Sequence, residues 1–157
     1  MSDLSLWQQA GDSSLIEHIL ARYHQVHRRQ LQDILPLAEK VATVHADTFP
    51  QDILPLLQHM QQDLLEHMLK EERVLFPMIL NGMGARAAMP INVMMHEHES
   101  HREAMAQLLA LSHQLTPPPD ACHSWQRLYA ELQTLLDDLN DHIELENNIL
   151  FARTLGH

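Results

Sequence analysis

The sequence predicts an all-α protein, folded as an up-down-up-down four-helix bundle. The first observation is composition: four glycines and 4% aromatic residues accompany abundant Leu, Met, Gln and Glu, which favour helices over strands. The second is the position of helix-breaking residues: three short segments rich in Pro, Gly or Asn divide the chain into four long stretches. The third is the helical spacing of apolar residues within those stretches. Four long helices with short connections form an up-down-up-down bundle.

The first helix is expected to begin near Ser14. Ser14 and Glu17 have the spacing of a capping box just ahead of an apolar run. The helix could continue to about Thr43. Pro36 lies inside it and removes one backbone donor, so we expect a kink or an earlier end there.

The second and third helices flank a glycine-containing turn. The second should follow the break at residues 49–52 and run to about Leu80. Residues 81–84 cannot easily remain helical. A third helix is expected to restart near Pro90, which suits a first-turn position, and to last until Thr116.

The fourth helix follows the clearest helix-breaking segment in the chain, residues 117–120, which contains three prolines. It is expected to extend from about Ala121 to Ala152. A chain of 157 residues is long enough for one domain with a real core. We therefore expect one domain at residues 13–157, preceded by a lead-in segment at residues 1–12.

Charge and cysteine content exclude several classes of function. The formal net charge is −11 and no Lys/Arg cluster is present, so neither nucleic acid nor an anionic membrane surface is an expected partner. No apolar stretch approaches the roughly 18 to 20 residues of a membrane span. Cys122 is the single cysteine, which excludes an internal disulfide or a Cys-rich metal site. A cytoplasmic location is expected.

Polar residues interrupt the apolar seams of two helices. In both helices the spacing of apolar positions alternates between three and four residues, the pattern of a bundle core. The seam of the fourth helix consists of Leu128, Leu132, Leu135, Leu139, His142, Glu146 and Ile149. The seam of the second helix consists of Leu57, Met60, Leu64, His67, Glu71, Val74 and Met78. A His-x-x-x-Glu pair therefore occupies core positions in each helix.

The two His-x-x-x-Glu pairs indicate a metal site. An unpaired buried carboxylate costs several kcal/mol or more, and no Lys or Arg occupies either seam. A bound cation would compensate the two glutamates. The i to i+4 spacing places each His one turn from its Glu on the same helix face, as two ligands of one ion require. The chain also contains 13 histidines, a high number that favours a metal site.

The segment His67–Phe76 repeats in the segment 142–151. Such a repeat suggests a pseudo-two-fold site in which each half contributes one His and one carboxylate. Two bridging carboxylates imply two metal ions, and iron or manganese suits these ligands. Glu72 lies one position off the seam and is expected to be dispensable for metal binding.

Residue counting selects the remaining ligands. At about 1.5 Å per residue, His24 and His98 return to the level of the two motifs on the other helices. His45 lies about 31 Å beyond His24 on a straight helix and is left out of the inner shell. His27 and His101 remain open as alternatives. The candidate ligands are His24, His67, Glu71, His98, His142 and Glu146.

At these residues the chain resembles the hemerythrin-like proteins, and closely the iron–sulfur cluster repair family (RIC, YtfE or ScdA type). The stretches that carry the resemblance are 22–24, 44–47, 67–79, 82–84, 97–99, 116–122 and 142–151. The resemblance implies a hemerythrin-like bundle with a non-haem di-iron centre. It implies four terminal histidines and two bridging carboxylates at the six candidate positions.

The resemblance also implies a function in the nitrosative and oxidative stress response. Such a protein would bind nitric oxide and help to repair damaged iron–sulfur clusters by donating iron. Two alternatives stay open: an O2 or NO sensor or scavenger that keeps its iron, and an oxidoreductase with NO-reductase or peroxidase-like activity. Repair-type proteins commonly carry an N-terminal domain with two cysteines, which this chain is expected to lack. A separate reductant could then be a partner.

Overall fold

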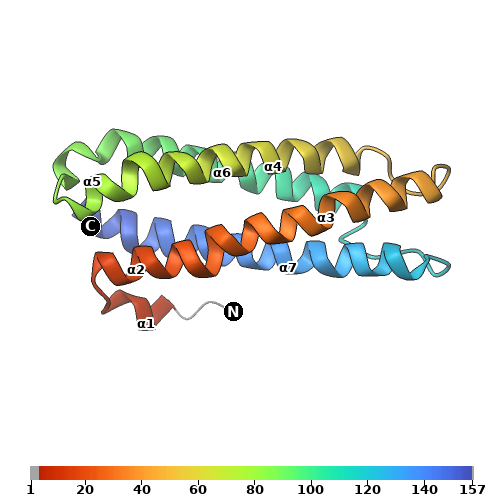
Figure 1. Ribbon diagram of the computed structural model, residues 1–157, viewed down its shortest axis with the longest axis horizontal. Coiled ribbons are helices and arrows are strands. Elements are labelled where there is room, and N and C mark those ends of the chain that lie inside the picture. The colour runs from red at the N-terminus through yellow and green to blue at the C-terminus, as the bar shows by residue number, and fades with distance from the viewer. Residues whose placement is uncertain (1–3, 157) are drawn as a thin grey trace.

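Helical segments stack end to end into four long rods that lie side by side (Figure 1). The computed structural model describes residues 4–156. The first rod consists of α2 (Asp12–His18), η1 (Ile19–His24) and α3 (Gln25–Val44). The second consists of α4 (Ile53–Lys70), η2 (Glu71–Leu75) and α5 (Phe76–Leu80). The third is α6 (Ala88–Leu111), and the fourth consists of α7 (His123–Leu145), η4 (Glu146–Phe151) and α8 (Ala152–Thr154).

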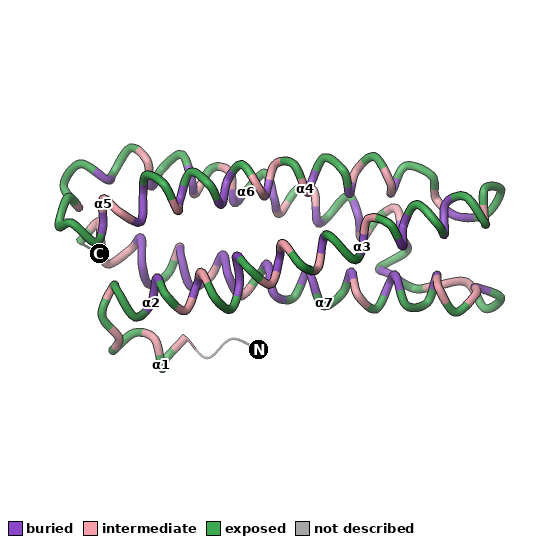
Figure 2. The backbone as a smooth tube through the Cα atoms, in the orientation of Figure 1, coloured by how far each residue is buried: buried purple, intermediate pink, exposed green. Residues whose placement is uncertain are grey.

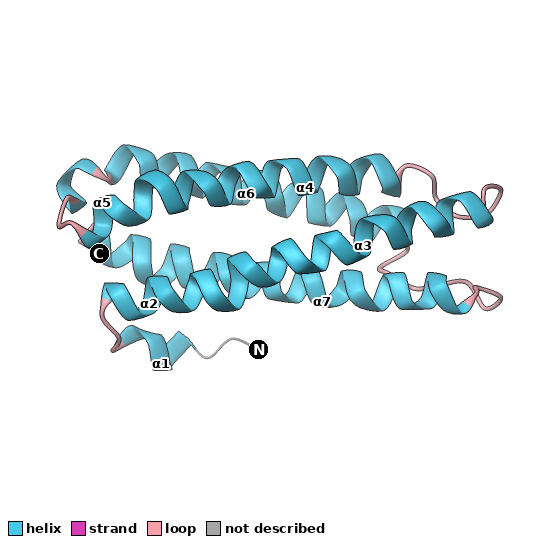
Figure 3. Ribbon diagram, viewed as in Figure 1, coloured by secondary structure: helices cyan, strands magenta, loops and turns pink. Residues whose placement is uncertain are grey.

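Two short elements complete the architecture, α1 (Leu4–Gln8) and the 3-10 turn η3 (Gly84–Arg86). Between residues 4 and 156 there is no strand, which confirms the all-α prediction (Figure 3). The α3–α4 and α6–α7 connections lie at one end of the bundle, and the α5–α6 connection lies at the other. In the part of the chain that the structure describes, no helix is both long and apolar enough to span a membrane.

Buried residues recur along the whole length of the rods (Figure 2), and most of them are apolar. They form two clusters. The distal core lies toward the α3–α4 connection and includes Leu31, Ile34, Leu57, Leu64, Leu108, Leu128 and Leu132. The proximal core lies toward the α5–α6 connection and includes Leu15, Ile19, Leu75, Phe76, Ile91, Leu150 and Phe151. Apart from Ser112 at the end of α6, the buried polar side chains fall between these two clusters, and every rod contributes to them.

Three of the four rods contain a π-helical segment: η1, η2 and η4. Each segment begins or ends at a candidate ligand: η1 ends at His24, η2 begins at Glu71 and η4 begins at Glu146. Widened turns of this kind occur frequently at functional sites. The irregular backbone therefore coincides with the polar zone between the two cores.

The π-helical segment η2 makes part of the predicted seam wrong. Val74 was expected in the core but is 52% exposed, and Met78 is only partly buried. Leu75 and Ile79 are buried instead. A π turn holds one more residue than an α turn, so the buried face beyond Glu71 moves by one position.

The first rod also differs from its prediction. It begins at Asp12 after Gly11, with no side-chain cap, so the capping box expected at Ser14 is absent. Asp12 instead pairs with Arg153, Oδ1 to Nη2, at 2.9 Å, which places a carboxylate at the helix N-terminus where the helix dipole favours it. The rod continues past Pro36 to Val44, so the helix does not end early.

The third rod ends earlier than predicted, at Leu111 rather than Thr116. Residues 113–115 have φ values of 53°, 60° and 56°, a left-handed turn. Ser112 stabilises this turn, because its Oγ donates to the Leu108 carbonyl and accepts from the Leu115 amide. In the fourth rod, Cys122 caps α7 by accepting from the Trp125 amide at 3.4 Å.

Candidate metal centre

All six candidate ligands meet in the polar zone between the two cores. Each is at most 1% exposed. One donor atom from each residue contributes to two overlapping groups, and within each group these atoms lie within 4.8 Å of one another. The first group, called position 1, is His24, His142, Glu71 and Glu146. The second, called position 2, is His67, His98, Glu71 and Glu146.

The backbone explains how each rod contributes. His67 and Glu71 lie one turn apart where α4 passes into η2, and His142 and Glu146 lie one turn apart where α7 passes into η4. The Nε2 atoms of these two histidines lie 3.4 Å and 2.8 Å from the carboxylate of their own pair. Both glutamates belong to both groups, so the carboxylates sit between the two positions.

Several donor atoms in the centre lack a hydrogen-bond partner. His67 Nε2, His98 Nε2, one oxygen of Glu71 and one oxygen of Glu146 are buried and unpartnered. His98 Nε2 is only 2.9 Å from Glu146 Oε1, yet the two do not form a hydrogen bond. Buried polar atoms are rarely left unsatisfied. Convergent, unpartnered nitrogen and oxygen donors fit a carboxylate-bridged di-iron centre.

Electrostatics show that the centre is built for positive charge. Burial lowers the pKa of His67, but Glu71 more than compensates and raises it to about 10. Burial likewise opposes the charged form of His24, and the neighbouring carboxylates of Glu146 and Glu71 outweigh it, raising its pKa well above the ordinary value. Burial raises the pKa of Glu146, but the charge of His142 and hydrogen bonds hold it well below the usual range. The raised pKa values of His24 and His67 favour protonated imidazoles beside these carboxylates.

Carboxylates outside the centre orient two of the four histidines. His24 Nδ1 donates to Glu72 Oε2 at 2.6 Å, and His67 Nδ1 donates to Glu97 Oε1 at 2.8 Å. The hydrogen bond from His67, with Lys70 nearby, lowers the pKa of Glu97 to about 2. Such outer carboxylates fix a metal-binding imidazole with Nε2 toward the ion.

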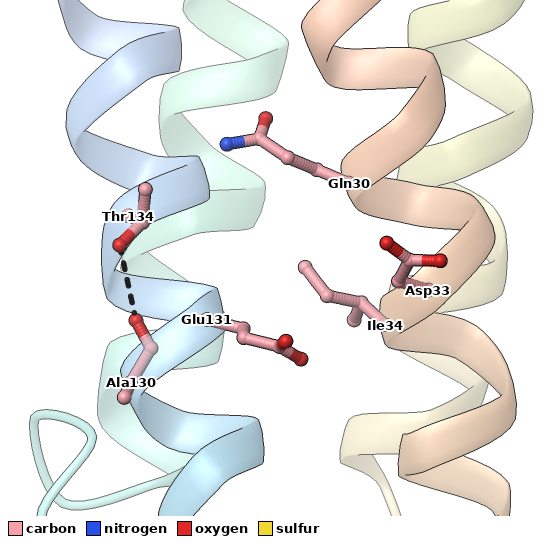
Figure 4. A pocket seen from close by; sticks show the side chains of 6 residues that line it. All are labelled: Gln30, Asp33, Ile34, Ala130, Glu131 and Thr134. Carbon is pink, nitrogen blue, oxygen red and sulfur yellow. Dashed lines mark hydrogen bonds between the residues drawn. The ribbon is translucent and has the colours of Figure 1, made fainter.

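The other two histidines have neutral outer partners. His98 Nδ1 lies 2.7 Å from Asn147 Oδ1, and His142 Nδ1 lies 3.1 Å from His27 Nε2. His27 Nδ1 lies 3.2 Å from Gln30 Oε1, and Gln30 donates to Asp138 at 2.9 Å. Figure 4 shows Gln30 reaching from α3 toward α7, beside a surface hollow of about 250 Å³.

The two alternative histidines, His27 and His101, and the excluded His45 fall outside both groups. His27 lies behind His142, and burial lowers its pKa well below the ordinary value. His101 lies 4.9 Å from the ring of His67, its Nδ1 is unpartnered, and burial lowers its pKa to about 3. His45 packs against Trp125 of the distal core, with Nε2 3.0 Å from Cys122 Sγ.

Sequence reasoning missed the outer partners. Glu72 was expected to be dispensable for metal binding, which stays a prediction, but its hydrogen bond to His24 was not foreseen. A usable signal existed: Glu72 follows Glu71, Asn147 follows Glu146, and Glu97 precedes His98. A metal-binding histidine needs an acceptor for its second nitrogen, and residues adjacent to ligands are well placed to supply one.

Comparison with known proteins agrees with this architecture. The hemerythrin HHE cation binding domain model matches residues 15–154. An iron-sulfur cluster repair protein DnrN from Neisseria gonorrhoeae is 57% identical over 99% of both chains. Iron-sulfur cluster repair proteins YtfE from Cronobacter sakazakii and Escherichia coli are 47% and 44% identical, over 96% of this chain and 69% of theirs. The chain therefore belongs to the hemerythrin HHE cation-binding family.

Proposed function

We propose that His24, His67, His98 and His142 are terminal ligands of two iron ions that Glu71 and Glu146 bridge. The observation that carries this proposal is the convergence of buried nitrogen and oxygen donor atoms from six residues on four rods, with unpartnered atoms at His67, His98, Glu71 and Glu146. The outer partners support it, because each histidine has its Nδ1 engaged and its Nε2 directed inward.

The function we propose is repair of damaged iron–sulfur clusters by donation of iron, within the cytoplasmic response to nitrosative and oxidative stress. The relatives named iron-sulfur cluster repair proteins support this role. Nitrogen and oxygen ligands bind ferrous iron with only moderate affinity compared with other divalent metals, so the protein can release it. Coordination positions left open on the iron can accept nitric oxide or O2. Damaged iron–sulfur proteins, and a separate reductant, are the partners this role requires.

The side chains of the centre suit a site that takes up and releases an ion. The charge of His142 and hydrogen bonds hold the pKa of Glu146 well below its usual range, and the pKa values of His24 and His67 are raised. When the ion leaves, protons can enter in its place, and the two buried carboxylates keep positive partners. The fold can then survive in both states.

The repair role is tested by transfer of iron. Protein carrying iron is mixed under reductant with an iron–sulfur enzyme that has lost its cluster, and recovery of enzyme activity is followed. The expected result is faster recovery than with the same concentration of free ferrous iron. Recovery no faster than the free-iron control would exclude donation.

The outcome also separates the alternatives. Reversible changes in the optical spectrum on adding nitric oxide, without loss of iron, would identify a sensor or scavenger. Steady consumption of nitric oxide or peroxide with a reductant would identify an oxidoreductase.

A further inference from the structure

The internal repeat of the sequence is matched by equivalent contacts in the structure. Phe76 of the first repeat stacks on His24, with ring centroids 5.7 Å apart. Phe151 of the second repeat stacks on His98, with centroids 6.0 Å apart. In each repeat, the residue after the shared glutamate contacts the histidine on which the phenylalanine of that repeat stacks. Glu72 contacts His24, and Asn147 contacts His98. Glu72 and Asn147 are thus pseudo-equivalent.

This equivalent pair differs in charge. Glu72 is a carboxylate whose Oε1 accepts a hydrogen bond from Arg28 at 3.1 Å, and its hydrogen bond with His24, at Oε2, is 2.6 Å long. Asn147 presents a neutral amide oxygen, and the corresponding distance to His98 is 2.7 Å. A carboxylate behind a metal-binding imidazole raises the basicity of that ligand, and changing such an outer partner typically alters metal affinity by about 10- to 100-fold.

When all four histidines are compared, the difference between the positions lies in the second histidine of each. His67 of position 2 has the carboxylate of Glu97 behind it, so each position contains one carboxylate-backed histidine. At position 1 the second histidine, His142, is backed by His27, which belongs to a hydrogen-bonded chain that ends at Asp138. At position 2 the second histidine is His98, whose partner is the amide of Asn147.

The two positions also differ in what covers their outer side. Its outer partner Glu97 and the neighbouring His101 line a surface hollow of about 250 Å³, together with Asp63, Glu66, Lys70 and Ser100. The outer side of position 1 is covered by Tyr23, which is 5% exposed and stacks on His142 at 5.5 Å between centroids. A surface hollow therefore adjoins the outer partner of position 2, whereas an aromatic ring covers His142 of position 1.

We infer that the two metal positions are inequivalent and that the ion held by His67 and His98 leaves first, with Asn147 as the positioning residue that sets the difference. This inference rests on the proposed di-iron site and specifies which ion is available for donation. Position 1 would then act as the retained, structural ion. Asn147 acts through His98 and does not itself bind metal.

The test measures how fast iron leaves. Protein carrying two ferrous ions per chain is mixed anaerobically with excess chromogenic ferrous chelator, and colour is followed with time. Wild-type protein should release its iron in two phases of about one ion each. Asn147→Asp should slow the fast phase by about tenfold or more, because a carboxylate then backs His98. Glu72→Gln should instead accelerate the slow phase.

Asn148→Asp is the matched control, because it adds the same charge at the neighbouring, exposed position. It should leave both phases unchanged. Release of both ions in one phase by the wild type, or equal effects of Asn147→Asp and Asn148→Asp, would overturn the inference while leaving the di-iron assignment intact. A starting content that never reaches two ions per chain would overturn the ligand assignment and the inference together.

Discussion

The distal core and the polar zone beside it are built from the same four rods but differ in backbone regularity and in the residues they bury. In the distal core the helices are regular, and Leu128, Leu132 and Leu135 are at most 1% exposed, with three- and four-residue spacing. In the polar zone the buried residues are histidines and glutamates, and three rods widen into π-helical segments. Regular spacing suffices to pack leucines, whereas the metal centre coincides with the irregular turns.

The difference shows where each region draws its stability. The distal core gains from removing apolar surface from water, about 25 cal/mol per Å². The polar zone buries two carboxylates, which is favourable only while a cation or protonated histidines compensate them. Substitutions in the two regions should therefore separate metal binding from folding stability.

The largest expected effect is the loss of metal from Glu71→Ala or Glu146→Ala. Each glutamate belongs to both positions, so either substitution should reduce iron from about two ions per chain to none. Metal analysis of purified protein measures this. Glu103→Ala removes an exposed carboxylate of α6 and should keep full metal content. Equal iron in all three variants would contradict the proposed site.

The second prediction concerns the distal core. Leu132→Ala removes a fully buried side chain and should lower the free energy of unfolding by about 2 to 5 kcal/mol. Denaturant titration of the metal-free protein measures it. Metal content should stay at the wild-type value. If Leu132→Ala also lost its iron, the two regions would not be independent.

A third prediction links metal uptake to pH. In the metal-free protein the raised pKa values of His24 and His67 keep both imidazoles protonated at neutral pH. Ligation requires neutral imidazoles, so uptake of iron at pH 7 should release about two protons per chain. Affinity should therefore rise with pH through neutrality and fall toward pH 5. Titration in weak buffer with a pH indicator measures the release; no release would show that the histidines are already neutral.

The smallest expected effect lies in the left-handed turn after α6. Gln114 has a φ of 60°, a conformation that costs a non-glycine residue roughly 1 to 2 kcal/mol. Gln114→Gly should stabilise the protein by about 0.5 to 1 kcal/mol, after the larger backbone entropy of glycine is subtracted. Thermal unfolding measures it, with metal content unchanged. Gln107→Gly, inside α6, is the opposite control and should destabilise by about 1 kcal/mol.

Much of the fold could be predicted because apolar spacing and helix breakers act locally. The four rods and their three connections follow from these signals, apart from ends that moved by a few residues. The end of α6 was missed because the Ser112 hydroxyl, rather than proline, stabilises the turn. The shift from Val74 to Leu75 was missed because nothing in the local pattern marks a π turn.

The sequence by itself determined which residues would meet in the centre. Helix rise and seam position bring the six candidates to one level, and they do meet there. Tertiary structure decided the rest: which nitrogen of each histidine faces inward, and which partner lies behind it. These depend on pairings between different rods, such as Glu97 with His67 and His27 with His142, and spacing along one helix does not specify what the neighbouring helix presents.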